Sequence, residues 1–150
     1  MVFGANGMLG RYLTEYLKHK YEVIPITRKE YDVMDCNSDL ESLFGNLNQN
    51  SVVINAIGLI PQASKNAVID NRLYIKINSV FPHMLADICD RYGVHLIHAT
   101  TDCVFDGIKG NYIETDIHNA ENMYGISKSA GEPYNCTVIR TSIIGEEVSN

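Results

Sequence analysis

Apolar runs of strand length alternate with helical patterns along the whole chain. The runs cover residues 2–3, 22–27, 52–57, 94–99 and 137–141. Such alternation is typical of βαβ units and a parallel sheet. Each run is apolar along its length rather than at every second position, which indicates that helices cover both faces of the sheet. The sequence therefore predicts an α/β fold with a doubly wound parallel sheet of the Rossmann type.

Four helical patterns lie between these runs, at residues 8–20, 38–47, 73–92 and 124–132. Pro82 lacks a backbone donor, so we expect the third helix to kink or divide just before it. Gly93 is suited to end that helix. Residues 106–123 are rich in glycine and asparagine with little periodicity, which predicts a long loop. At 150 residues with 45% hydrophobic content, residues 1–150 are long enough for one domain with a sizeable core.

Three glycines, at positions 4, 7 and 10, stand between the first strand and the first helix. Glycine lets a turn bring its backbone close to a pyrophosphate, and the helix N-terminus adds free N–H groups with a partial positive charge. The spacing is GxxGxxG rather than GxGxxG. We interpret the turn as a dinucleotide cradle, with cofactor contacts from Gly4, Asn6, Gly7, Met8 and Leu9.

The end of the second predicted strand bears on the choice of cofactor. An acidic residue normally stands there when the ribose 2′-hydroxyl of NAD is bound. This chain has Thr27-Arg28-Lys29 instead, and a guanidinium can bind a 2′-phosphate. We therefore expect NADPH through Arg28, and NADH is left open because Arg28 and Lys29 also fit a solvated loop.

Tyr124 and Lys128 stand four residues apart in a helical pattern. That spacing puts both side chains on one face of a helix, where an ammonium can lower the pKa of a phenol from about 10. A hydride that reaches a ketone carbon loads charge onto the carbonyl oxygen, which then needs a proton and hydrogen-bond donors. We predict that Tyr124 supplies this proton and that Lys128 holds the phenol pKa down.

Charge and composition exclude several classes of function. Twelve basic and eighteen acidic residues give a net charge of −6 without a Lys/Arg cluster, so we expect no nucleic-acid partner. No apolar run reaches the roughly 18 residues of a membrane helix, and the first residues lack the basic-then-apolar pattern of a secretory signal, so we expect a cytoplasmic protein with no membrane span. The four cysteines form no CxxC pair, and His95 and His98 would lie on opposite faces of a strand, so no metal site is expected.

Five motifs follow one another along nearly the whole chain: Gly4-Ala-Asn-Gly7-Met-Leu-Gly10, Asp32-Val33-Met-Asp35, Asn55-Ala56, Thr100-Thr101-Asp102-Cys-Val-Phe-Asp106-Gly107 and Tyr124-Gly-Ile-Ser-Lys-Ser-Ala-Gly-Glu132. Together they resemble the extended short-chain dehydrogenase/reductase family, and most of all its dTDP-4-dehydrorhamnose reductase branch. The resemblance implies an NAD(P)H-dependent reductase of a 4-keto nucleoside-diphosphate deoxysugar in surface polysaccharide biosynthesis.

The resemblance also implies roles for single residues. The catalytic set would be Thr101, Tyr124 and Lys128, with the Thr101 hydroxyl donating to the carbonyl oxygen. Asp32 and Val33 would line the adenine, and the segment 55–57 would pass beneath the cofactor. The implied cofactor contacts outside the glycine turn are thus Arg28, Asp32, Val33, Asn55, Ala56, Ile57, Tyr124 and Lys128. Asn78 matches a position near the active site of this family, but it also fits a polar residue inside a helix.

Cys103 bears on the neighbouring reactions of this superfamily. Sugar-nucleotide 4,6-dehydratases carry an Asp-Glu pair just after the catalytic threonine, whereas this chain has Asp102-Cys103, so dehydration is disfavoured. The GDP-fucose synthase branch, an epimerase-reductase, places a cysteine there as an acid/base group, so epimerisation stays open. A non-catalytic NADP-binding regulatory module is a further alternative, although such modules can lose the tyrosine or the lysine and this chain keeps both.

Members of the resembled family build a substrate lobe largely from sequence after the last of these motifs. The chain given stops at Asn150. We therefore expect residues 1–150 to be the dinucleotide-binding domain, as a fragment that lacks the C-terminal substrate lobe. The expected partner is a nucleotide-sugar substrate, and a homodimer is left open.

Overall fold

The computed structural model describes residues 1–63 and 69–142. Within these residues a single sheet holds five strands in the order β2-β1-β3-β4-β5, and every neighbouring pair is parallel. The strands are β1 (Val2–Phe3), β2 (Pro25–Ile26), β3 (Val52–Asn55), β4 (His95–Thr101) and β5 (Thr137–Thr141). The predicted parallel sheet is confirmed.

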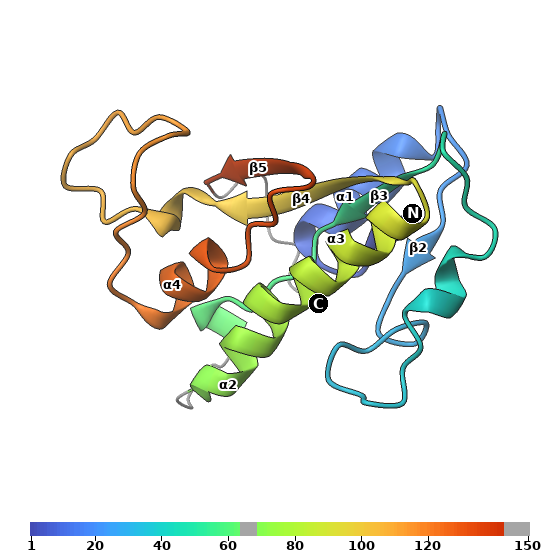
Figure 1. Ribbon diagram of the computed structural model, residues 1–150, viewed down its shortest axis with the longest axis horizontal. Helices are drawn as coiled ribbons and strands as arrows, with labels where there is room; N and C mark the ends of the chain where they lie inside the picture. Colours follow the sequence, from blue (N-terminus) through green and yellow to red (C-terminus); the bar gives the residue numbers. More distant parts are fainter. Residues whose placement is uncertain (64–68, 143–150) are drawn as a thin grey trace.

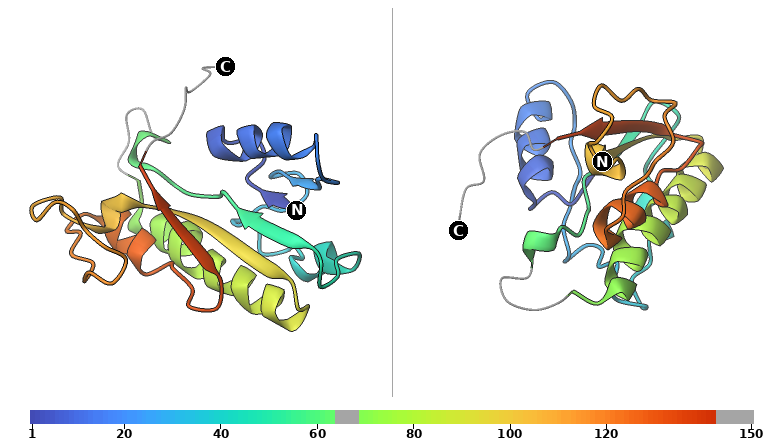
Figure 2. Two further views of the ribbon diagram at one scale, coloured as in Figure 1. Left: turned by 90° about the horizontal axis from the view of Figure 1, so that it is seen from above. Right: turned by 90° about the vertical axis from the view of Figure 1, so that its left-hand side faces the viewer.

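Helices lie on both faces of this sheet (Figure 1, Figure 2). Helix α1 (Met8–Leu17) covers one face, while α2 (Asn71–Tyr74), α3 (Phe81–Arg91) and α4 (Met123–Ser129) lie on the other. The sheet is therefore doubly wound, as predicted. This arrangement explains why the strand runs are apolar along their length.

The strand order changes direction at β1. On one side Val2 pairs with Pro25 of β2, and on the other side it pairs with Ile54 of β3. In open α/β sheets, ligands bind outside the carboxyl ends of the strands at such a switch point. Gly4, which follows β1, and Ala56, which follows β3, lie at this place.

The ends of several elements differ from their predicted positions. The predicted strand 22–27 is reduced to Pro25–Ile26, because its neighbour β1 offers only two residues for pairing. The strand predicted at 94–99 extends to Thr101. The other changes are that β3 ends at Asn55, α1 ends at Leu17 and α4 covers Met123–Ser129.

The predicted helix at 38–47 is wrong. The segment forms one 3-10 turn, η1 (Glu41–Phe44), and the Asp39 carboxylate accepts from the Glu41 N–H at 3.0 Å. Leu40 and Phe44 are both buried, and their four-residue spacing imitated the apolar stripe of a helix. The glycine and asparagines that follow Phe44 have low helix propensity, so the turn does not continue.

The predicted helix at 73–92 consists of three helical parts that follow one another directly. Helix α2 is followed by a π-helix, η3 (Ile75–Val80), and then by α3, in which Pro82 is the second residue. The Phe81 N–H donates to the Lys76 carbonyl five residues back. Pro82, which follows, has no backbone N–H and so needs no acceptor. Gly93 adopts φ +64° after α3, so the expected stop is confirmed. The expected division is not seen, because Val80 and Phe81 keep right-handed helical angles and only the hydrogen-bond pattern changes before Pro82.

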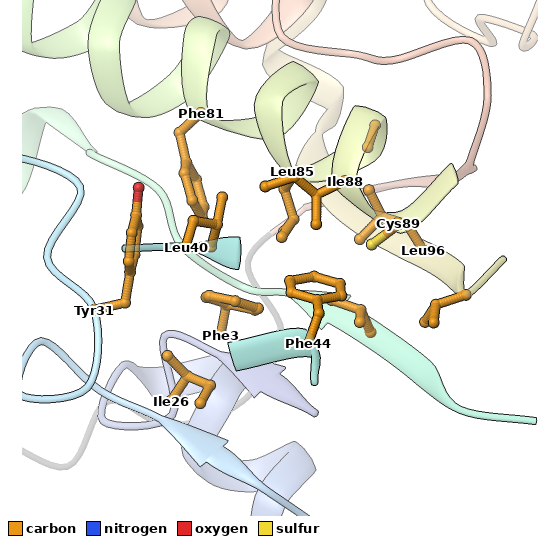
Figure 3. Packing of buried hydrophobic residues seen from close by; sticks show 13 residues of the cluster. Phe3, Ile26, Tyr31, Leu40, Phe44, Phe81, Leu85, Ile88, Cys89 and Leu96 are labelled. Atoms are coloured by element: carbon orange, nitrogen blue, oxygen red, sulfur yellow. The ribbon is translucent and has the colours of Figure 1, made fainter. Parts of the chain in front are cut away.

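The hydrophobic core lies between the sheet and α3 (Figure 3). The rings of Phe3, Tyr31 and Phe81 pack together with centroids between 5.6 and 6.2 Å apart. Phe44 from η1 is fully buried at the same core, and its ring lies 5.4 Å from that of Tyr92. The core therefore fastens the loop-rich segment after β2 to the sheet.

In the described part of the chain, no helix has the length and apolar character needed to cross a bilayer. The same residues contain no group of three His, Cys, Asp or Glu side chains that could hold a metal ion. On β4, His95 is exposed and His98 is fully buried, which confirms that they lie on opposite faces.

We expect Phe44→Ala to lower the free energy of unfolding by about 3–5 kcal/mol, because it leaves a cavity where a fully buried ring anchors η1. Urea unfolding of the protein measures the change. Ile108→Ala serves as the control, because Ile108 is 88% exposed and should change stability by no more than about 0.5 kcal/mol. Equal stabilities of the two variants would show that η1 is not anchored by Phe44.

Candidate active site

The glycine turn after β1 is a tightly packed backbone structure. Gly4 adopts φ +76°, its N–H donates to the Ile26 carbonyl at 3.0 Å, and its carbonyl accepts from the Gly7 N–H at 2.9 Å. A Cβ on Gly10 would lie 2.1 Å from the Gly4 carbonyl oxygen, so α1 can approach β1 this closely only with glycine at this position. No side chain caps α1 at Gly7, which leaves N–H groups of its first turn available to an anion.

The loop after β3 packs directly against this turn. A Cβ on Gly4 would lie 3.0 Å from the Ala56 carbonyl group and 3.1 Å from an Ile57 side-chain carbon. The Ala56 N–H donates to the Phe3 carbonyl at 3.1 Å. Ala56 and Ile57 therefore lie beside the glycine turn, as expected. The Asn55 side chain is fully buried and points into the protein.

The three predicted catalytic residues come from two elements. Thr101 is the last residue of β4, and Tyr124 and Lys128 lie on α4. The Asn122 side chain caps α4 by accepting from the Gly125 N–H at 2.8 Å. A Cβ on Gly125 would lie 2.3 Å from the Cys103 carbonyl oxygen. Helix α4 is thus pressed against the segment that follows Thr101, and the set is brought together.

The surroundings of Tyr124 and Lys128 change the pKa values of both side chains. Burial raises the pKa of Tyr124, and the hydrogen bond of the Thr101 side chain opposes that rise. The lowering of the phenol pKa by Lys128 stays a prediction. The Lys128 ammonium donates to the Ala99 carbonyl at 3.3 Å. Burial lowers the pKa of Lys128 to about 8, and Glu132 opposes that change.

Asn78 links three segments around α4. The residue is fully buried in the π-helix η3, and its amide oxygen accepts from the Leu59 N–H at 2.7 Å. The amide nitrogen donates to the Leu59 carbonyl at 2.9 Å and to the Ser127 hydroxyl at 3.1 Å. Ser127 in turn donates to the Tyr124 carbonyl at 2.8 Å. Asn78 therefore holds the loop after β3 to the helix that carries Tyr124, and every polar atom of its side chain is used for this.

The end of β2 carries charges of both signs. Arg28 is exposed, and the Glu30 carboxylate accepts from the Thr27 N–H at 2.8 Å and from the Thr27 hydroxyl at 2.6 Å. The sequence analysis missed Glu30, because only the fold of the loop shows that its carboxylate turns back to Thr27. Asp32 is half-buried and accepts from the Met34 N–H at 2.9 Å. The remaining predicted contacts differ in exposure: Asn6 and Gly7 are exposed, Leu9 is 36% exposed, and Met8 and Val33 are half-buried.

A pocket of about 480 Å³ lies beside Thr101. Its walls come from the residues after β4, the predicted loop and the end of β5, and they include Asp102, Cys103, Phe105, Tyr112 and Arg140. The rings of Phe105 and Tyr112 are stacked 4.2 Å apart. The exposed Cys103 thiol donates to Asp102 at 3.6 Å.

The Arg140 guanidinium at this pocket is already paired. Its Nε and Nη2 atoms donate to the two carboxylate oxygens of Glu132 at 2.9 and 2.7 Å. Nη1 donates to the Glu114 carbonyl at 3.2 Å. Arg140 therefore fixes the wall of the pocket to the segment that follows α4 and to the loop, rather than presenting a free positive charge.

A doubly wound parallel sheet with a glycine turn after its first strand defines a Rossmann-type, dinucleotide-binding fold. The sequence matches the family described as RmlD substrate binding domain over residues 1–147. The chain belongs to this family.

Three known proteins show what the chain resembles. It is 35% identical to the spore coat polysaccharide biosynthesis protein SpsK of Bacillus subtilis, over 100% of this chain and 55% of that protein. A crystal structure of dTDP-4-dehydrorhamnose reductase from Clostridium acetobutylicum superposes with TM-score 0.81 at 30% identity, covering 99% and 55% of the two chains. The Bacillus anthracis dTDP-4-dehydrorhamnose reductase, solved in complex with NADP, gives TM-score 0.73 at 28% identity over 87% and 46%. The chain thus spans about half the length of these proteins.

We expect the buried Lys128 to make stability depend on pH. In the unfolded chain its pKa returns to about 10.4, so between pH 8 and 10 the unfolded state binds more protons than the folded state. The free energy of unfolding therefore gains from Lys128 as pH rises through this window, by at most about 3 kcal/mol.

Lys128→Met should remove that gain. Urea unfolding at pH 7.5 and 10 measures it as the difference between wild type and variant, so that contributions from the tyrosines and from Cys89 cancel. The exposed Lys29→Met is the matched control. Wild-type and Lys128→Met curves that stay parallel across the window would contradict the prediction.

Proposed function

We propose that the protein is an NADPH-dependent reductase of a 4-keto nucleoside-diphosphate deoxysugar. The observation that carries the proposal is the position of Thr101, Tyr124 and Lys128 at the same sheet edge as the Gly4 turn. A hydride donor seated on that turn would have a proton donor close to it. Family membership and the dTDP-4-dehydrorhamnose reductases among the solved neighbours support the same reaction.

In this proposal, side chains of the protein donate a proton and a hydrogen bond to the carbonyl oxygen of the substrate. Bound NADPH would supply the hydride. Because burial raises the pKa of Tyr124, the phenol keeps its proton at neutral pH and can deliver it to the developing alkoxide. The Thr101 hydroxyl would donate to the same oxygen. Lys128 would hold the ribose hydroxyls through its ammonium. Burial lowers the pKa of this group to about 8.

The cofactor proposal rests on the glycine turn and on Arg28. The uncapped first turn of α1 offers N–H groups to a pyrophosphate, and exposed Arg28 at the end of β2 offers a cation to a 2′-phosphate. A neighbour of the chain was solved with NADP. Glu30 at the same strand end works against a phosphate, so NADH stays as an alternative cofactor.

The relatives of the chain support a biosynthetic role for the reaction. The similarity to a spore coat polysaccharide protein supports a role in surface polysaccharide biosynthesis. The exposed Cys103 thiol in the pocket beside Thr101 favours, as a second candidate, an epimerase-reductase that also moves a proton at a carbon next to the ketone. A cytoplasmic location, a homodimer and a further substrate lobe stay predictions.

We expect Tyr124→Phe in the full-length protein to lower kcat by roughly 10²–10⁴-fold with little change in NADPH affinity, because the phenol acts on the developing alkoxide. Lys128→Ala should lower both kcat and the affinity for NADPH. NADPH oxidation with a 4-keto sugar nucleotide and calorimetric titration measure the two effects. Tyr134→Phe is the control, since Tyr134 is 97% exposed. A Tyr124→Phe enzyme that keeps most of its turnover would remove Tyr124 from the mechanism.

We expect Arg28→Ala to weaken NADPH binding by about 1.5–3 kcal/mol, the scale of a charge-assisted contact, and to affect NADH much less. Calorimetric titration with both cofactors decides the matter. Lys29→Ala is the matched control, because the neighbouring residue is equally exposed and positive. Equal losses for the two cofactors would mean that Arg28 is only a solvated residue.

A further inference from the structure

Two fully buried polar residues face each other across strands β3 and β4. Asn55 and His98 are direct partners in the parallel register, and both are 0% exposed. The Asn55 amide nitrogen lies 3.1 Å from His98 Nδ1. The Asn55 amide oxygen accepts from the Ile57 N–H at 3.0 Å. The pair thus connects a core histidine to the backbone that leaves β3.

The orientations of both side chains follow from these contacts. Since the Asn55 oxygen accepts from Ile57, the amide NH₂ must face His98, and His98 Nδ1 must be the acceptor. The single ring proton of His98 then lies on Nε2, which is buried without a partner in the described residues. Burial and, second, the charge of Lys128 lower the pKa of His98 to about 3. Nδ1 is therefore an acceptor at any pH near neutral.

The backbone fixed in this way is part of the proposed dinucleotide site. Ile57 follows Ala56, whose carbonyl group lies against Gly4 and whose N–H is held by the Phe3 carbonyl. Without the acceptor on His98, the buried Asn55 NH₂ would lose this partner, and a movement of the side chain toward another acceptor would draw the amide oxygen away from the Ile57 N–H.

We propose that His98 is a positioning residue for dinucleotide binding, which acts through the Asn55 amide to hold residues 56 and 57 against the Gly4 turn. This inference rests on the proposed function. Neither His98 nor the Asn55 amide touches the cofactor in this arrangement, because both are enclosed by protein. The effect should therefore fall on cofactor affinity rather than on the chemical step.

A double-mutant cycle on the full-length protein tests the proposal. We expect His98→Leu and Asn55→Ala each to raise the Kd for NADPH about tenfold, and the double variant to raise it by no more than the larger single effect. The kcat at saturating NADPH should stay within about threefold of wild type. Single effects that multiply in the double variant would show that the two residues act independently and would overturn the proposal.

Two further variants separate positioning from packing. His98→Gln keeps a side-chain acceptor and should restore the Kd to within about threefold of wild type. His95→Leu changes the exposed histidine on the other face of β4 and should leave the Kd unchanged. Should the leucine variant at position 98 fail to fold, His98→Phe keeps the ring without the acceptor, and comparing it with His98→Gln gives the same decision.

Hydrogen exchange of the Ile57 amide gives a readout that needs no cofactor. Its protection should fall in His98→Leu and persist in His98→Gln and His95→Leu. If the wild-type protein does not bind NADPH, the proposed function fails, while loss of Ile57 protection would still support the Asn55–His98 link. Unchanged Ile57 protection in His98→Leu would overturn the inference, whatever the cofactor affinity.

Discussion

The contact between the Gly4 turn and the loop after β3 is the constraint on which the rest of the site depends. Two parallel strands end side by side here, and the backbones are so close that a Cβ on Gly4 would meet Ala56 at 3.0 Å. Gly10 brings α1 onto the same turn. Because β4 pairs with β3 and continues to Thr101, the proposed catalytic set lies at the same edge of the sheet. A small displacement of the Ala56 backbone would therefore change the place at which α1, β1 and β3 meet.

The features that sequence analysis predicted well are those decided by nearby residues. The Gly4 turn and the stop at Gly93 each follow from the backbone preferences of glycine. The strand positions follow from continuous apolar runs. The helix predicted at 38–47 failed because the same four-residue spacing of Leu40 and Phe44 fits one buried 3-10 turn, and only the core shows which of the two forms.

The features that the sequence did not reveal depend on distant partners. Asn55 and His98 are 43 residues apart, and Asn78 and Ser127 are 49 apart. No local pattern shows that Asn55 turns inward instead of toward a ligand. In the same way, the four-residue spacing of Tyr124 and Lys128 correctly placed both on α4, but it could not show that the ammonium would donate to the Ala99 carbonyl.

Four polar side chains around the proposed site are buried. Asn55, Asn78, His98 and Lys128 are each no more than 4% exposed. Burial of such groups is unfavourable unless every donor and acceptor is paired, and the His98 Nε2 and Thr100 hydroxyl have no partner in the described residues. An apolar residue at position 98 would remove one of these costs, so His98→Leu can leave stability unchanged and still loosen residues 56 and 57. Stability alone is therefore a poor measure of what these residues do, and cofactor affinity is the sensitive one.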